Sequence, residues 1–312
     1  MPATDSQAGP VRLDAAGLGD CLRGMLAALR EHEDELNRLN VFPVRDHDTG
    51  TNMALTLEGV VKAVDAVGGR PLRELADAVV DAALLEARGN SGIILAEVLH
   101  GLFETWAPLE LMGAGDLVRG FRAAAERADK AVLEPVEGTI LTVVRATAKA
   151  LGELPESDPA ALLAAGAEAA ARAVEATTEQ LGALRDAGVV DAAGRGFELC
   201  VRAFAATAAG RGLAGAGDGP AAAPTPSRGP AHPSRGPAFE VQYLLACGEW
   251  DAEELKRYLA GIGDSIAVAR SDGLYRVHVH TDHAGPAIEE ALRHGPVSQI
   301  QVAYLGEEPA PD

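Results

Sequence analysis

The residues best suited to chemistry lie in one short stretch, residues 40–52, which reads NVFPVRDHDTGTN. Asp46 and Asp48 are two carboxylates one residue apart, and hard oxygen atoms are the ligands that Mg²⁺ prefers. Small hydroxyl and amide residues follow at a predicted helix start, where backbone N–H groups are unpaired. They are Thr49, Gly50, Thr51 and Asn52. The stretch therefore predicts a site that holds Mg²⁺ beside phosphate oxygens.

Three further glycine-rich polar turns precede predicted helices, at residues 89–92, 138–139 and 191–196. Apolar residues at helical spacing predict about eight helices, and the four turns precede the second, fourth, sixth and eighth of them. Short connections make neighbouring helices antiparallel, so all four turns are expected at one end of the bundle. Several helix N-termini would then surround one spot and form an anion site.

A simpler explanation exists for each turn taken alone. A glycine that ends one helix and a hydroxyl that begins the next are found in any helical protein. Asp46 and Asp48 alone are likewise explained as loop or N-cap carboxylates. The shared position of four such turns favours the common site.

The composition restricts the class of protein. The 312 residues include 27 basic and 46 acidic side chains, giving a net charge of −19. This charge disfavours binding to nucleic acid or to an anionic membrane, and a bound nucleotide would need a metal to screen its phosphates. Neither a signal peptide nor an apolar stretch long enough to span a bilayer is present, so we expect a cytoplasmic protein. Three widely spaced cysteines indicate no disulfide framework and are expected to be small buried residues.

The chain divides into two predicted domains. Residues 1–12 and 306–312 are expected to be tails, and residues 13–210 a helical domain. Residues 211–238 are rich in Gly, Ala and Pro and predict a linker. Residues 239–305 then read βαββαβ, a ferredoxin-like α+β pattern whose first and third strands lie side by side and antiparallel.

Two histidines on the third of these strands point to a second candidate metal site. His278 and His280 share one face of the sheet, because side chains alternate along a strand. Glu240 and Gln242 of the first strand share that face, which places Glu240 close to His280. Glu240, His278 and His280 form a reasonable zinc ligand set. The alternative is an open polar sheet face, which would suggest a homodimer through the second domain; His47 and His283 are expected to be exposed.

Four ordered motifs and the tail together resemble one protein family. The motifs are NVFPVRDHDTGTNM, ARGNSGIIL, EGTILTV and AGVVDAAGRG, and the tail contributes VQYLL, IGDS and VHVHTD. They resemble the ATP-binding kinase subunit of bacterial fatty acid kinase, whose first domain is the DhaL-type (DAK2) domain also found in dihydroxyacetone kinases. The resemblance covers essentially the whole chain.

The resemblance implies an all-α eight-helix antiparallel barrel that holds Mg-ATP at one end. Asn40, Asp46 and Asp48 would contact magnesium, and His278 and His280 would be needed for activity together with the two aspartates. The nucleotide or its phosphates would be contacted by Thr49, Gly50, Asn52, Asn90, Ser91, Gly92, Thr139, Asp191 and Gly194. It also implies a DegV-like partner that presents a fatty acid, whose carboxylate receives the γ-phosphoryl group to give an acyl phosphate.

The chain departs from the family pattern at several positions. The usual PVPDGD is PVRDHD here, so Arg45 and His47 replace a proline and a glycine. Ala192 stands where a serine is usual, and Glu240 aligns with a family cysteine. Many members continue into a third, DegV-like region, which does not follow here. Two other functions stay open: the nucleotide subunit of a dihydroxyacetone kinase, which the ferredoxin-like tail disfavours, and a scaffold or sensor that binds Mg-ATP without transfer.

Overall fold

The computed structural model describes residues 13–154, 158–210, 237–248 and 252–305. The two predicted tails and most of the predicted linker lie outside the described residues. Within the described part of the chain, no helix is long and apolar enough to cross a membrane.

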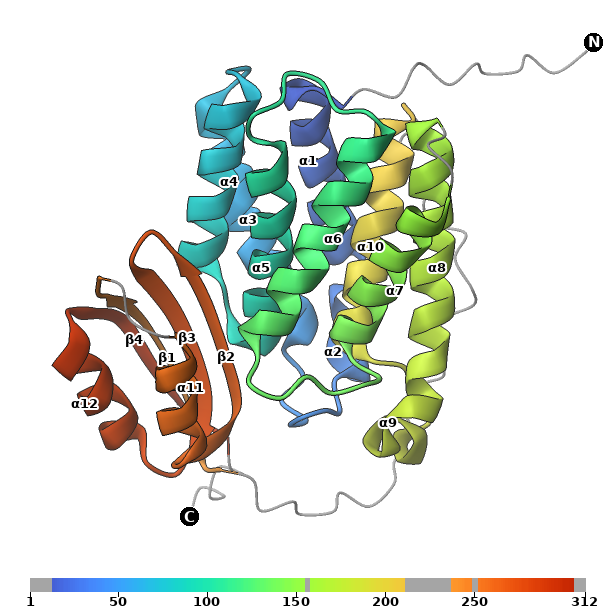
Figure 1. The fold of residues 1–312 in the computed structure, drawn as a ribbon. Helices are drawn as coiled ribbons and strands as arrows, with labels where there is room; N and C mark the ends of the chain where they lie inside the picture. The colour runs from blue at the N-terminus through green and yellow to red at the C-terminus, as the bar shows by residue number, and fades with distance from the viewer. Residues whose placement is uncertain (1–12, 155–157, 211–236, 249–251, 306–312) are drawn as a thin grey trace, which may run out of the picture.

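Eight long helices form a closed ring in the first domain (Figure 1). They are α1 (Ala15–Glu31), α3 (Thr49–Val67), α4 (Leu72–Glu86), α5 (Gly89–Trp106), α6 (Ala114–Ala131), α7 (Ile140–Glu153), α8 (Pro159–Gln180) and α10 (Ala192–Ala208). Each helix packs against the next in this order, and α10 packs back against α1. The expected eight-helix antiparallel barrel is confirmed, with two short helices added to it.

The short helices α2 (Glu33–Leu39) and α9 (Gly182–Ala187) correct the predicted element boundaries. Apolar residues continue at helical spacing from Leu18 to Leu39, but the backbone leaves the helical region at His32, where φ is −105° and ψ is 11°. The acidic residues that open α2 explain the new start, since negative charge is favourable at a helix N-terminus. Asp14 caps the start of α1, because its side chain accepts a 2.8 Å hydrogen bond from the Gly17 N–H.

Small residues let the helices of the ring approach one another closely. Gly101 of α5 faces α6 so tightly that a Cβ atom there would lie 2.6 Å from the Cα of Ala124. Cys21 and Cys200 are buried in this ring, whereas Cys247 in the second domain is only half-buried. The core is built mainly from alanine, leucine, valine and isoleucine side chains.

The second domain is a four-stranded antiparallel sheet with two helices. Its elements are β1 (Phe239–Ala246), α11 (Ala252–Ala260), β2 (Gly263–Ser271), β3 (Leu274–Thr281), α12 (Ala284–His294) and β4 (Val297–Tyr304), and the strand order is β2-β3-β1-β4. The predicted pairing of β1 with β3 is confirmed, and Glu240 lies opposite His280 in the register. The ferredoxin-like pattern read from the sequence is therefore the observed topology.

The sheet lies against the helical ring, near the ends of α4 and α5 (Figure 1). Side chains from one face of the sheet, among them Val241 and Val277, pack on α11 and α12. The expectation that the other face is open is wrong: His278 is 1% and His280 is 2% exposed. The helical domain docks on this face at β2 and β3, whereas the edge strand β4 is exposed. A dimer through the second domain stays a prediction.

Specific contacts hold the two domains together. The Glu97 carboxylate of α5 accepts a 3.0 Å hydrogen bond from the Arg270 N–H of β2, and it also pairs with Arg127 at 2.8 Å. The Lys256 ammonium of α11 donates to the Lys130 carbonyl of α6. Val132 and Ala267 form a single antiparallel bridge between the domains. These contacts fix the sheet face against the end of the ring.

Candidate functional site

A cavity of about 420 Å³ lies between the ring and the sheet. The residues at or before the first turns of α3, α5, α7 and α10 line one side, and β1, β2 and β3 line the other. The shared end predicted for the four turns is therefore confirmed. The predicted site residues that line the cavity are Asn40, Asp46, Asp48, Thr49, Asn52, Asn90, Ser91, Thr139, Asp191, Glu240, His278 and His280.

The three predicted glycine contacts lie behind the cavity wall instead. A Cβ atom on Gly50 would lie 2.4 Å from the Glu33 carbonyl oxygen, and one on Gly92 would lie 2.4 Å from the Thr56 hydroxyl. At Gly194 it would lie 2.9 Å from the Val143 side chain. These glycines bring helices together so that the neighbouring polar residues reach the cavity.

Gly89, which begins α5, lines the cavity and is required for two reasons. Its φ of +58° is a conformation that side chains disfavour, and a Cβ atom would lie 2.5 Å from the Asn52 amide nitrogen. The next residue, Asn90, has a buried side-chain oxygen with no hydrogen-bond partner among the described residues. The start of α5 therefore holds one buried polar atom, the Asn90 side-chain oxygen, that the described residues leave unpaired.

The loop before α3 places two carboxylates, those of Asp46 and Asp48, at the cavity. Asp48 is the N-cap residue of α3, yet its side chain makes no capping hydrogen bond. The buried Asn40 amide donates to the Asp46 carboxylate. His47 is exposed, as expected, and its φ of +60° is the conformation that a glycine adopts readily. Arg45 is also exposed and does not line the cavity, so it supplies no counter-charge there.

The cavity lining is strongly acidic. It contains six carboxylate side chains and two histidines, with neither Lys nor Arg among the described lining residues. Partial removal from water and repulsion by Asp48 raise the pKa of Asp46 to about 7. One oxygen each from Asp46, Asp48 and Glu240 lies within 4.8 Å of the others, a donor set that fits a hard divalent cation.

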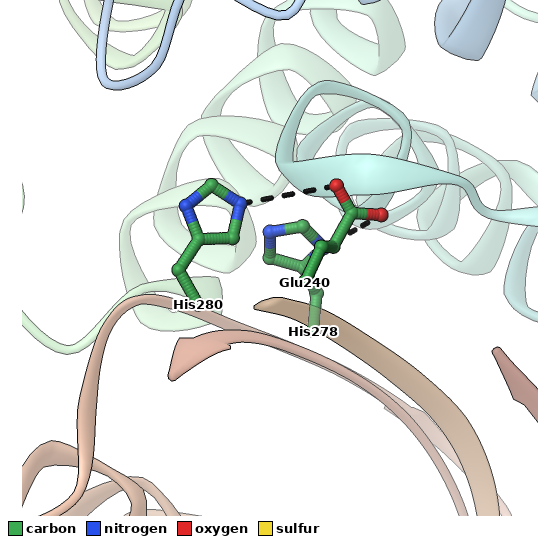
Figure 2. A group of neighbouring side chains, drawn as sticks. All are labelled: Glu240, His278 and His280. Carbon is green, nitrogen blue, oxygen red and sulfur yellow. Dashed lines mark ion pairs between the residues drawn. The ribbon is translucent and has the colours of Figure 1, made fainter. Parts of the chain in front are cut away.

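The Glu240 carboxylate also lies beside both histidine rings, as Figure 2 shows. Its carboxylate oxygens are 3.9 Å from His278 Nδ1 and 3.9 Å from His280 Nε2. Both nitrogens of His278 and Nδ1 of His280 are buried without a hydrogen-bond partner among the described residues. Burial lowers the pKa of both histidines, so both imidazoles are neutral, as metal ligation requires. The predicted Glu/His/His set is thus brought together and fits a metal such as zinc.

Asp191 has a structural role besides its place in the lining. Its carboxylate accepts a 2.7 Å hydrogen bond from the Gly194 N–H and so caps α10. Burial raises the pKa of Asp191 to about 6. Thr139, at the start of α7, donates its hydroxyl to the Val136 carbonyl at 2.8 Å. Both residues shape a helix N-terminus that faces the cavity.

Two residues of the sheet hold the start of α5 and were not singled out from the sequence. Gln242 accepts a 3.2 Å hydrogen bond from the Gly89 N–H and donates to the Glu240 carboxylate. Arg276 is 3% exposed and donates to the Ala87 carbonyl at 2.9 Å. Strand alternation places Gln242 on the face of Glu240, but only the docked domains reveal its partner in α5.

The geometry defines a class: a helical ring whose helix N-termini and acidic loop face one cavity, which an α+β domain closes. Residues 43–206 match the DAK2 domain, so the chain belongs to the DAK2 domain family. Residues 236–310 match the FakA-like middle domain of fatty acid kinases.

Several known proteins are similar to this chain in sequence or in structure. Protein YloV of Bacillus subtilis is 29% identical over 316 residues, covering 95% of this chain and 56% of that protein. An uncharacterized protein of Staphylococcus saprophyticus is 29% identical over 298 residues, covering 90% of this chain and 53% of that protein. The chain thus spans about half the length of these relatives. The dihydroxyacetone kinase from C. freundii in complex with AMP-PNP and Mg²⁺ superposes with a TM-score of 0.47 at 16% identity, covering 66% of this chain and 36% of that one.

Proposed function

We propose that this chain binds Mg-ATP in the cavity and transfers the γ-phosphoryl group to the carboxylate of a fatty acid, which a separate DegV-like protein presents. The observation that carries the proposal is the convergence of four helix N-termini on a cavity with a carboxylate cluster. The match to the FakA-like middle domain of fatty acid kinases supports the acceptor class.

The cavity offers separate regions for the parts of a nucleotide. The partial positive charge at the helix starts and the side chains of Thr49, Asn90 and Ser91 suit phosphate oxygens. Side chains of the protein already accept hydrogen bonds from the Gly50, Gly89 and Gly194 N–H groups. Apolar residues line another part and suit a flat base; they include Phe42, Val44, Val132, Leu133, Val136 and Ile140. Six carboxylates would repel a polyphosphate, so the nucleotide must arrive with its cations.

Asp46, Asp48 and Glu240 would hold magnesium, with Asn40 orienting Asp46 through its amide. Bound magnesium would neutralise phosphate charge and stabilise the negative charge of the transition state. The protein's own contribution is then positioning: helix N–H groups fix the phosphates, and the docked sheet limits access of water. A carboxylate acceptor is already ionised at neutral pH, so the transfer requires no general base.

The test measures ATP-dependent acyl phosphate formation with a DegV-like partner loaded with fatty acid. Asp46→Asn is expected to lower turnover roughly 100-fold or more, because a metal ligand is lost. Asp77→Asn removes the same charge from an exposed position on α4 outside the cavity and serves as the control. Unchanged turnover in Asp46→Asn would refute the magnesium assignment.

The same assay separates the other two functions. Phosphorylation of dihydroxyacetone with a ketone-carrying partner, and not of fatty acid, would identify the nucleotide-binding component of a dihydroxyacetone kinase. Tight Mg-ATP binding in calorimetry without transfer to any partner would identify a scaffold or sensor.

A further inference from the structure

Glu240 belongs to two groups of potential metal ligands that come from different domains. Asp46 and Asp48, in the loop before α3, form one group with it, and His278 and His280 of β3 form the other. Within each group, one ligand atom per residue lies within 4.8 Å of the others. Glu240 is common to both groups.

The histidine side carries independent evidence that it faces a ligand. His278 is 1% exposed, and neither of its ring nitrogens has a hydrogen-bond partner among the described residues. Burying a polar ring without a partner is costly. Figure 2 shows both rings beside the Glu240 carboxylate, at distances too long for hydrogen bonds but suited to an ion between the groups.

The negative charge of the cavity lining also exceeds the positive charge of one divalent cation. Six carboxylates line the cavity, and the described lining contains neither Lys nor Arg to offset them. The three clustered carboxylates alone exceed the charge of one divalent ion. A second cation beside the histidines would offset the remainder.

We propose that the Glu240 carboxylate bridges two divalent cations, one held with Asp46 and Asp48 and the other with His278 and His280. The inference rests on the proposed function for the identity of the first cation, the magnesium that accompanies the nucleotide. Carboxylate oxygens carry enough lone pairs to bind two ions. The all-oxygen position suits Mg²⁺, and the position with two imidazoles suits Zn²⁺.

Gln242 orients the bridging group. Its side-chain amide donates to the Glu240 carboxylate, and its oxygen accepts a hydrogen bond from the Gly89 N–H at the start of α5. Partners of this kind fix the direction of a metal ligand. Since the aspartates and the histidines lie in different domains, the pair of ions is complete only when the domains are docked.

Metal affinities of the chelator-treated full chain, measured without nucleotide, test the bridge. Zn²⁺ is measured by competition with a chromophoric chelator, and Mn²⁺, as a substitute for Mg²⁺, by electron paramagnetic resonance of the free ion. Glu240→Gln is expected to weaken the binding of both ions at least ~10-fold, which is the lower end of the loss in affinity caused by removing a supporting partner. Asp48→Asn should weaken the binding of Mn²⁺ only, and His280→Gln should weaken the binding of Zn²⁺ only.

Asp264→Asn is the matched control, because Asp264 lines the same cavity but belongs to neither ligand group. An effect of Glu240→Gln on one ion only, or an equal effect of Asp264→Asn on both, would overturn the bridge.

A second measurement does not depend on how the variants fold. With Mn²⁺ in the oxygen position and Cu²⁺ beside the histidines, wild-type protein should show one magnetically coupled pair, because bridged ions lie about 4 Å apart. Two independent signals would overturn the bridge. A coupled pair in a chain that fails to bind Mg-AMP-PNP would count against the proposed function alone, and nucleotide binding without coupling would count against the bridge alone.

Discussion

The central strands β1 and β3 of the second domain's sheet are buried on both faces, but for different purposes. One face packs apolar side chains, such as Val241 and Leu245, against α11 and α12. The other places Gln242, Arg276 and His278 against the helical ring. Burying apolar area stabilises a fold, whereas burying polar groups costs free energy unless they are paired. The polar face therefore contributes a site, and the apolar face contributes the stability that holds it.

The largest effect on stability is expected from the apolar face. Leu245→Ala should lower the free energy of unfolding by about 2–5 kcal/mol, because Leu245 is fully buried and its truncation leaves a cavity. Leu292→Ala, at a position that is 54% exposed, should change it by less than about 0.5 kcal/mol. Denaturant titration measures both, and similar values for the two variants would contradict the comparison.

The polar face should behave in the opposite way. His278→Leu in metal-free protein is expected to leave the free energy of unfolding within about 1 kcal/mol or to raise it, because an unpaired buried ring is replaced by an apolar one. The same variant should also lose the stabilisation that zinc gives to the wild type, which is about 2.7 kcal/mol at a Zn²⁺ concentration of 100 Kd. Thermal unfolding with and without Zn²⁺ measures both effects. A large loss in the metal-free variant would show that this face does stabilise the fold.

Acid should weaken the polar face selectively. Burial lowers the pKa of His278 well below 6.5, so the unfolded chain binds a proton first as the pH falls. The contribution of His278 to the free energy of unfolding is therefore complete above pH 6.5. It is lost as the pH falls below 6.5, by at most about 1.4 kcal/mol per pH unit. Comparing wild type with His278→Leu from pH 7.5 to 5.5 isolates the effect. Parallel stability curves would refute it.

The smallest effect concerns the one polar atom on the apolar face with no described partner. Tyr243 is fully buried, and its hydroxyl has no hydrogen-bond partner among the described residues. Tyr243→Phe should leave stability unchanged or raise it by up to about 1 kcal/mol. A clear loss in denaturant titration would reveal that the hydroxyl is paired in solution.

Much of the site follows from the sequence, because it depends on local rules. Helical spacing and short connections place Asp48, Asn90, Thr139 and Asp191 at one end of the ring, and strand alternation places Glu240 beside His280. These rules act within an element or between consecutive elements.

The remainder depends on contacts between distant parts of the chain. The burial of His278 and the hydrogen bond from Gly89 to Gln242 exist only because the domains dock, and no periodicity in either domain reports that contact. Helical spacing does not reveal the break at His32 for a different reason, because apolar residues continue at that spacing across it. The acidic residues after His32 are the signal that a second helix begins there.

The closed ring has a consequence for how the protein is made. α1 completes its packing only when α10 is present, and the Cys21 thiol meets the Phe204 carbonyl across 183 residues of sequence. At ribosomal speeds of about 5–20 residues per second, the apolar side of α1 waits roughly 10–40 s for its partner. The helical domain is thus obliged to finish folding late, and the four helix starts meet around the cavity only once the last of them has been synthesised.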